Sequence, residues 1–329
     1  MELKTADKVN GLRARAKAGN ANAQFHLAQN LFNREQAKRN QAEVFRWMRA
    51  AADQGHLDAQ FHLALCYHEG IGVQPNLQQA IVWYNIAARR GYAGAQCNLG
   101  WCYAVGEGVK RDLKRALNWY TQAANQGDAD AQAALGEAFL EGKGAGRRYA
   151  EAVTWLRQSA RQGVPEAQRL LAYCYDQGLG ISQNRQQAVR WYQRAARRGD
   201  IIAQYNLALC YRDGIGIAKN SRAAVKWYIR AASLGDAHAQ SDLGWCYAEG
   251  NGVQRNPSKA FIWYTKAAHQ KNSKALYNLG LCYLEGYGTR TSVQKALRCF
   301  RQAAHLGHAR AKRMLKKLKK SGGVLPGSD

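Results

Sequence analysis

Cysteine and histidine are the residues of this 329-residue chain whose types could support chemistry, because both bind metals and cysteine also forms disulfides. Six of the eight cysteines are spaced by 36 residues or a multiple of it: Cys66, Cys102, Cys174, Cys210, Cys246 and Cys282. Residues one helical repeat apart lie in successive layers about 8–10 Å apart, beyond the Cα reach of most disulfides. We therefore predict small buried side chains with reduced thiols.

The remaining motifs do not indicate catalysis or a metal site. His62 and His68 are six residues apart, about 240° around a helix, so their side chains diverge. Glycine pairs such as Gly70 and Gly72 lack the third glycine and the preceding strand of a phosphate-binding loop. The sequence contains no nucleophile elbow, Walker loop or His-Glu-x-x-His motif. These observations predict a non-enzymatic protein without metal, cofactor or small-molecule substrate.

A marker pair, alanine followed by glutamine, recurs every 36 residues without insertion. The markers are Ala23, Ala59, Ala95, Ala131, Ala167, Ala203 and Ala239, and alanine alone continues the series at Ala275 and Ala311. Each marker begins one helical face, because apolar residues follow it at intervals of four. A second helix carries Ala-x-x-Trp-Tyr-x-x-Ala-Ala, as in residues 80–88. One helix pair cannot bury both faces alone, so neighbouring units are expected to stack.

Glycines and capping residues mark the ends of these predicted helices. The first helices should end at glycines that suit a left-handed backbone, at positions 70, 106, 142, 178, 214, 250 and 286. The second helices should begin after preferred N-cap residues, namely Asn40, Asn76, Asp112, Asn184, Asn220, Asn256 and Ser292. Pro257 suits a first helical position, and Glu43 predicts a capping box with Asn40. Arg148 breaks the series, so a frayed helix start is expected there.

The repeated pattern resembles the Sel1-like repeat, a relative of the tetratricopeptide repeat. Residues 95–127 carry it almost whole, with Leu99, Tyr103, Trp119 and Gly127 at characteristic positions. The departures are Arg34 and Gln36 for the loop glycines of the first unit, Lys271 for the closing glycine of the seventh, and Cys299 for the tryptophan of the eighth. The resemblance implies an all-α fold, a right-handed α-solenoid superhelix of about eight helix-turn-helix repeats with helical caps.

The expected organisation has four parts. A capping helix occupies residues 1–22, eight repeats occupy 23–307, a polar capping helix occupies 308–320, and 321–329 form a flexible tail. The sequence shows neither a signal-peptide core nor an apolar run of about 18 residues. A cytoplasmic location is predicted, with a secreted or periplasmic one as the alternative if a signal has been trimmed.

The resemblance also implies that the first helices line a concave groove, with the positions two, three, six and nine after each marker facing it. The candidate groove residues are Phe25, Phe61, His62, Asn98, Trp101, Tyr173, Tyr205, Asn206, Trp245, Tyr277 and Asn278. Aromatic side chains are enriched among binding hot spots, and an amide can both donate to and accept from a peptide backbone. The alternative is that these residues only pack within the fold.

Charge is distributed unevenly along the chain, whose formal net charge is +25. The eight stretches from marker alanine to second loop glycine hold four basic and ten acidic residues. The groove should therefore be neutral to acidic. The second helices and loops should form a basic outer face that includes Arg89, Arg90, Lys114, Arg115, Arg147, Arg148, Arg197 and Arg198. Such a face is either a solvated surface or a binding site.

The leading prediction is a non-catalytic scaffold or adaptor that binds a peptide or partner protein in its groove. The alternative is a binder of anionic polymers or a membrane surface, such as nucleic acid or acidic lipid, through the basic outer face. Nucleic-acid binding would weaken steeply with salt, unlike an apolar groove contact. A weaker alternative is a secreted or periplasmic repeat protein that contacts envelope or host components.

Overall fold

The computed structural model describes residues 2–32 and 40–320, with side chains from residue 10 to residue 319. These residues form eighteen α-helices and no strand. The chain divides into two compact units, residues 1–167 and residues 168–329, and the division falls inside α10. The predicted tail 321–329 and the first-unit substitutions Arg34 and Gln36 lie outside the described residues.

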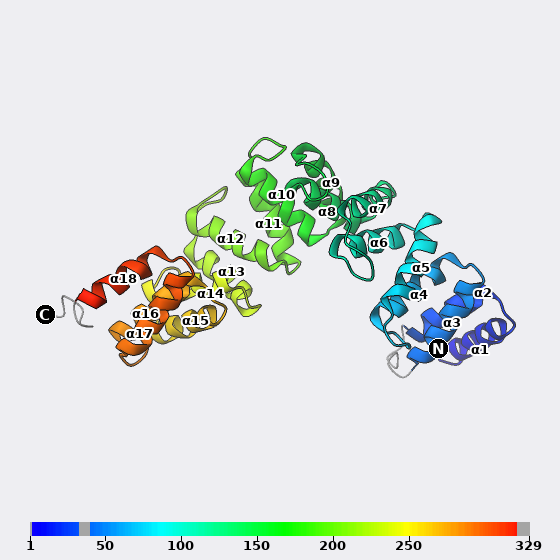
Figure 1. The fold of residues 1–329 in the computed structure, drawn as a ribbon, viewed down its shortest axis with the longest axis horizontal. Coiled ribbons are helices and arrows are strands. Elements are labelled where there is room, and N and C mark those ends of the chain that lie inside the picture. Colours follow the sequence, from blue (N-terminus) through cyan, green and yellow to red (C-terminus); the bar gives the residue numbers. More distant parts are fainter. Residues whose placement is uncertain (1, 33–39, 321–329) are drawn as a thin grey trace. The chain divides into compact units, whose positions relative to one another are not determined.

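Helices alternate between two roles in every repeat (Figure 1). The first helices are α2 (Ala21–Phe32), α4 (Leu57–Glu69), α6 (Ala93–Val105), α8 (Ala129–Glu141), α10 (Pro165–Gln177), α12 (Ile201–Asp213), α14 (Ala237–Glu249) and α16 (Ser273–Glu285). The second helices are α3 (Gln41–Asp53), α5 (Leu77–Arg89), α7 (Leu113–Asn125), α9 (Tyr149–Gln162), α11 (Arg185–Arg197), α13 (Ser221–Ser233), α15 (Pro257–His269) and α17 (Val293–His305). Consecutive helices pack side by side from α1 to α9 in the first unit and from α11 to α18 in the second.

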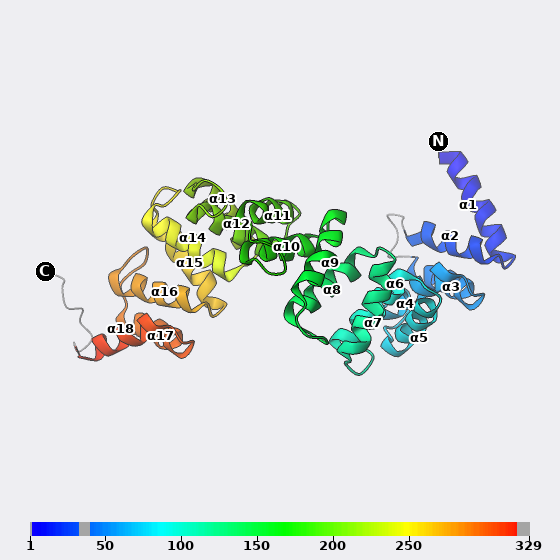
Figure 2. The same ribbon diagram turned by 90° about the horizontal axis from the view of Figure 1, so that it is seen from above.

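One helix precedes the first repeat and one follows the last. Helix α1 (Glu2–Lys17) packs against α2, and α18 (Ala309–Lys320) packs against α17 (Figure 2). Ala16 of α1 and Leu318 of α18 are buried, so each terminal helix covers apolar surface that the neighbouring repeat would otherwise expose.

The core of each repeat combines small residues on the first helix with a large residue on the second. The marker Ala59 and the apolar Leu63 are fully buried, as is the Tyr84 ring. A glycine or alanine five residues after each marker lets that ring approach: a Cβ added at Gly100 would lie 2.9 Å from the Tyr120 ring. Close helix packing therefore explains why this position is restricted to alanine and glycine.

The marker glutamine joins three backbone segments. Gln96 Nε2 donates to the carbonyl oxygen of Ala88 in the preceding repeat, at 3.0 Å. Its Oε1 accepts a hydrogen bond of 2.7 Å from Gln126 Nε2, at the end of the second helix of its own repeat. Gln96 is only 3% exposed, and a buried amide needs such partners. The recurrent glutamine is therefore a structural element of the repeat junction.

The predicted N-caps of the second helices are largely confirmed. Side chains at six of the seven positions accept from the backbone N–H three residues later: Asn76, Asp112, Asn184, Asn220, Asn256 and Ser292. The capping box between Asn40 and Glu43 was wrong. Glu43 instead accepts from Arg13 at 2.8 Å and from the Trp47 indole at 3.2 Å, and these bonds hold its pKa below the ordinary value although burial opposes them.

The start of α9 differs from the frayed end that was expected. Helix α9 begins at Tyr149, at the same repeat position as its equivalents, and the preceding Arg148 pairs with Glu151 at 3.4 Å. Glu151 lies in the first turn, where a carboxylate interacts favourably with the helix dipole.

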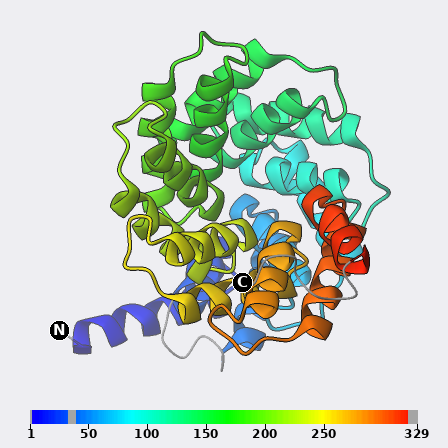
Figure 3. The ribbon, with the colours of Figure 1, turned by 90° about the vertical axis from the view of Figure 1, so that its left-hand side faces the viewer.

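The two loop glycines have different roles. Gly70 ends α4 in the left-handed conformation that was predicted, at φ 76°. Gly72 also has a positive φ, and a Cβ there would lie 2.0 Å from the carbonyl oxygen of Gln41 in the preceding repeat. The second glycine is therefore needed for contact between repeats. In the second to eighth repeats, connections that contain these glycines join the two helices of the repeat (Figure 3).

Candidate functional site

Several pockets of the described residues lie on the surface formed by the first helices. We call it the first-helix face and define it by the side chains two, three and six positions after each marker. In residues 168–329, one pocket of about 570 Å³ is lined by residues of α12, α14, α16 and α18. The first helices of three successive repeats and the terminal helix α18 thus contribute to one site.

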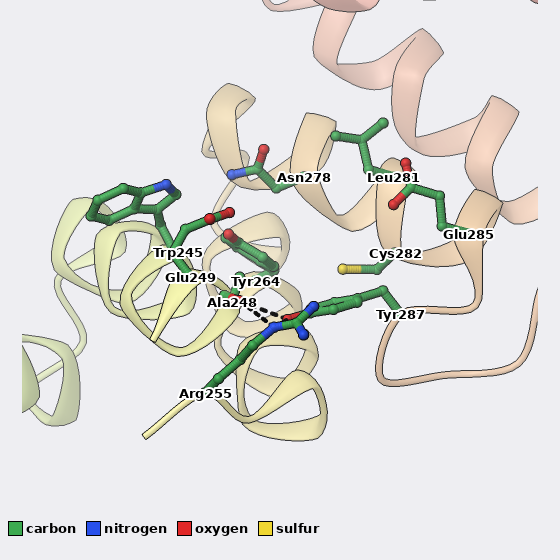
Figure 4. A pocket seen from close by; sticks show the side chains of 10 residues that line it. All are labelled: Trp245, Ala248, Glu249, Arg255, Tyr264, Asn278, Leu281, Cys282, Glu285 and Tyr287. Carbon is green, nitrogen blue, oxygen red and sulfur yellow. Dashed lines mark hydrogen bonds between the residues drawn. The ribbon is translucent and has the colours of Figure 1, made fainter. Parts of the chain in front are cut away.

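An adjoining pocket of about 370 Å³ lies between α14 and α16 (Figure 4). Trp245 and Asn278 line both pockets, so the two are continuous along the first-helix face. Arg255, which lines this pocket, donates to the Ala248 carbonyl oxygen at 3.1 Å and to the Tyr287 hydroxyl at 3.1 Å. Glu249 and Glu285 also line this pocket. With Arg255 held by neutral oxygens, the pocket has one cation against two carboxylates and is acidic.

Asp242 is the most buried charged residue of the larger pocket, with its side chain 7% exposed. It accepts from Lys274 Nζ at 2.7 Å, from the Tyr205 hydroxyl at 3.2 Å and from Arg212 Nη1 at 3.4 Å. The same arginine makes two further bonds to Asp213, at 2.8 and 2.7 Å, which lower the pKa of that carboxyl. A buried carboxylate with three donors fixes the surrounding side chains in place.

In residues 1–167, the pocket at the repeat position equivalent to that of Figure 4 is more apolar than the pocket of Figure 4. This pocket of about 490 Å³ is lined by Trp101, Val105, Leu113 and Tyr120, and also by the charged residues Arg111, Glu137 and Lys143. Trp101 is 43% exposed, and its ring lies 5.8 Å from that of His68. Lys143 is paired with Glu141 and Glu137, and the hydrogen bond that the lysine donates to Glu141 raises the pKa of the lysine. An exposed indole beside an apolar hollow suits an apolar side chain of a partner.

Four candidate residues in the first three repeats have partners of their own. Phe25 is 5% exposed and packs against His56 and His62, with ring centroids 4.6 and 5.6 Å away. Phe61 is half-buried and stacks on Tyr92 at 4.8 Å. Burial lowers the pKa of His62.

Asn98 donates to the Tyr84 hydroxyl at 3.3 Å, and that tyrosine is fully buried. Asn98 therefore supports a core tyrosine and is half-buried. Phe25 is itself buried, so we leave it out of the proposed contact surface.

The candidates of the later repeats lie nearer to solvent. Tyr173 is 46% exposed, and Asn206, Trp245, Tyr277 and Asn278 are half-buried. Tyr277 stacks on His308 at 4.7 Å and lines the larger pocket. The structure thus brings Trp245, Tyr277 and Asn278 together, whereas Tyr205 is half-buried and bonded to Asp242.

The basic residues predicted for the outer face are all exposed, but several already have acidic, backbone or ring partners. Arg90 donates to the Gly55 carbonyl oxygen and to Gln60 Oε1, both at 2.7 Å. Arg115 pairs with Asp112, and its guanidinium lies 5.6 Å from the Tyr103 ring. Arg148, besides its bond to Glu151, lies 5.3 Å from the Phe139 ring. Arg90 in particular belongs to the repeat junction.

The cysteine side chains are set in apolar surroundings. All eight thiols are free, and Cys97 is the one that is not buried. Burial raises the pKa of Cys66, Cys174 and Cys246 to about 12, which keeps them in the unreactive thiol form. Among the described residues, no group of three or more histidine, cysteine or acidic side chains is placed to hold a metal ion.

Sequence reasoning missed the charged residues of the larger pocket. Lys274 and Arg310 each directly precede a marker alanine, and Arg212 lies nine positions after one. Position nine was predicted to face the groove, but the candidate residues were taken only from the positions two, three and six after each marker. His308 was also missed: its Nδ1 accepts from the backbone N–H of Ala311 at 3.2 Å and caps α18. A row of capping residues before the first helices, including Asp200, Asp236 and Asn272, was the signal available.

Tandem helix pairs, a glutamine at seven of the eight marker positions and left-handed glycine turns define a Sel1-type solenoid repeat. The Sel1 repeat model matches eight consecutive segments: residues 21–56, 57–92, 93–128, 129–164, 165–200, 201–236, 237–272 and 273–308. The chain belongs to the Sel1 repeat family. Such repeat solenoids are typical of protein–protein interaction scaffolds, and the family is generally non-catalytic.

Two solved structures resemble the chain closely. A protective antigen present in uropathogenic Escherichia coli strains, which displays an SLR fold, is 33% identical with a TM-score of 0.85; the match covers 96% of this chain and 68% of that one. A Sel1 repeat protein from Oxalobacter formigenes is 34% identical with a TM-score of 0.68, over 94% and 89% of the two chains. A comparison with curated proteins found no match. Within the described residues, no helix is both long and apolar enough to span a membrane.

Proposed function

We propose that this chain is a non-catalytic scaffold that holds an extended segment of a partner protein against its first-helix face. One observation carries the proposal: α12, α14, α16 and α18 line a single pocket whose walls include Trp245 and Tyr277. Side chains of three successive repeats and of the terminal helix α18 can then contact several consecutive residues of one segment. Aromatic walls supply apolar contact area at a low cost in conformational entropy.

A second pocket extends the proposed contact surface in the other unit. The exposed Trp101 lies at the same repeat position as Trp245, six residues after its marker alanine. Its apolar area stays in water unless a partner covers it. Because the family generally binds protein partners, we take a polypeptide as the ligand.

The test compares partner capture by the wild-type protein with capture by a variant carrying Trp101→Ala and Trp245→Ala. Removing a hot-spot tryptophan typically costs at least about 2 kcal/mol of binding free energy, so we expect capture to be lost. Thermal unfolding should change little for Trp101→Ala and more for Trp245→Ala, because the second indole is half-buried. Collapse of the fold in the Trp101 variant would show that this side chain serves the core.

The matched control carries Arg89→Gln and Arg197→Gln on second helices. Both arginines are exposed, and Arg90 is left intact because it bonds to the preceding repeat. This control should retain the partner at both low and high salt. If it alone loses the partner, and if binding to DNA or anionic vesicles falls steeply with salt, the basic outer face is the working surface.

A further inference from the structure

The larger pocket on the first-helix face has an excess of positive charge. Its lining includes Arg212, Lys274 and Arg310 against Asp213 and Asp242, which leaves one positive charge in excess. The stretches that form most of the face hold ten acidic and four basic residues. The pocket is therefore a local cationic site on a face with more acidic than basic residues.

The donors of this pocket are not all used within the protein. Lys274 donates one of its three N–H groups to Asp242, and the lysine side chain is 54% exposed. His308 accepts at Nδ1 from the Ala311 backbone, so the proton of the neutral ring is on Nε2. Arg310 adds a guanidinium to the same lining, and Asn278 adds an amide.

Asp242 holds the donor side chains in position but does not cancel the net positive charge of the pocket. Its bonds to Lys274, Tyr205 and Arg212 hold these side chains along one wall, and its own carboxylate is buried. Tyr277, stacked on His308, and Trp245 form apolar walls beside the donors. Charged donors placed against aromatic walls are suited to a carboxylate on a short aliphatic stem.

The pocket is continuous with others on two sides. It shares Trp245 and Asn278 with the acidic pocket of Figure 4, and Asp242 and Lys274 with a pocket of about 340 Å³ lined by Tyr205 and His238. A chain can enter on one side and leave on the other, so the geometry favours an internal residue of a segment over a chain end.

We propose that this pocket binds the side-chain carboxylate of an aspartate or glutamate within the partner segment, with Lys274, Arg310 and His308 as its donors. The proposal rests on the proposed function and specifies its ligand chemistry. The acidic pocket of Figure 4, lined by Glu249 and Glu285, then favours a basic residue of the same segment close to the acidic one.

The experiment selects linear peptides from a displayed random library on the full-length protein. We expect the selected peptides to share an internal acidic residue. The best peptide is then synthesised with an amidated end, and its affinity is measured by fluorescence anisotropy beside an analogue with glutamine or asparagine in place of that acid. The analogue should bind about tenfold more weakly or worse, as for loss of a charge-assisted hydrogen bond.

Protein variants locate the effect. Lys274→Gln with Arg310→Gln should weaken the acidic peptide by a similar factor and should not weaken the neutral analogue further. A matched pair, Lys226→Gln with Arg190→Gln, changes the same charge at exposed second-helix positions and should leave both affinities unchanged. Circular dichroism confirms that each variant is folded.

The outcomes separate the two proposals. If peptide affinity depends on Trp245 but is unchanged when the acidic residue of the peptide is replaced, the carboxylate proposal is overturned and the proposed scaffold function still holds. Binding that is lost on amidation, but not on replacing the internal acid, would assign the pocket to a chain terminus and overturn the side-chain form. If no peptide is selected, or if only the outer-face variant prevents binding, both proposals fail.

Discussion

Leu234 stands where other repeats have a side chain that bonds to the marker glutamine. Gln126, Gln162 and Gln270 at this position donate to the marker Oε1 of their repeats at 2.7, 2.9 and 2.9 Å. In the repeat of Leu234, Gln204 Oε1 has no hydrogen-bond partner among the described residues. We predict that Leu234→Gln stabilises the protein.

The magnitude follows from the hydrogen bonds that a glutamine would add and the small apolar area that leucine now buries. The new amide would reach Gln204 Oε1 and, as Gln270 does with Gly235 at 2.8 Å, the carbonyl oxygen of Gly199. A net hydrogen bond contributes about 0.5–1.5 kcal/mol, and relieving a buried unsatisfied acceptor belongs at the upper end. Leu234 is 55% exposed, so little apolar burial is lost. The expected gain in unfolding free energy is about 1 kcal/mol, or roughly 2–4 °C in melting temperature for a unit of this size.

The assay combines thermal and urea unfolding followed by circular dichroism with hydrogen exchange at α12 and α13. Solenoids unfold in parts, so exchange localises the gain to the repeat that was changed. The control is Leu306→Gln, because the marker position opposite holds Leu276, which is buried and offers no amide. That control should be neutral or destabilising. An unchanged or lower stability of Leu234→Gln, with α12 still helical, would refute the role assigned to the glutamine junction.

Four further outcomes are expected. Gly252→Ala should lower the unfolding free energy by about 2 kcal/mol or more, because its Cβ would lie 2.2 Å from the Ser221 carbonyl oxygen. Gly235 has a similar positive φ but open space around it, so Gly235→Ala should cost only the backbone strain of about 1 kcal/mol. Urea titrations of both variants measure the difference. Asp242→Asn should lower the unfolding free energy by about 1–3 kcal/mol, since it removes the charge that holds Lys274 and Arg212, and a calorimetric melt matching wild type would contradict this. Burial lowers the folded-state pKa of His62, so the neutral ring stabilises the fold above about pH 6.5, and this stability is lost as the pH falls towards the folded-state pKa. In melts from pH 7.5 to 5, the melting temperature of His62→Gln should therefore fall less than that of the wild-type protein. Reductant should leave the melting temperature nearly unchanged, and iodoacetamide at pH 8 should label the buried thiols only after unfolding, because the pKa of Cys66 and Cys282 is raised to about 12.

Local signals predicted the helices and most of their ends. Asn76, Gly70 and Pro257 act through their own backbone neighbourhood, so their roles follow from residue type and position. Lys271 takes the place of a closing glycine and still adopts a positive φ of 59°, because the fold imposes that turn. Glu43 could not be assigned in the same way, since its partner Arg13 is 30 residues away on α1.

The candidate site was harder to predict because it combines several repeats. Periodicity places Trp101 and Trp245 on one face, and both line pockets. It cannot reveal that Asp242 meets Lys274 from the next repeat, 32 residues away, or that Arg310 joins them from α18. Periodicity also placed Phe25 and Tyr277 in the same set of candidate groove residues, although the ring of Phe25 packs against His56.

Within each unit, every helix pair in extensive contact is adjacent along the chain. Force applied to the ends of such a unit passes through each junction in turn, as through links in series. The weakest link opens first, and its release leaves the remaining links folded. Each 36-residue repeat that opens frees roughly 120 Å of extended chain, so tension would lengthen the protein in discrete, repeat-sized steps.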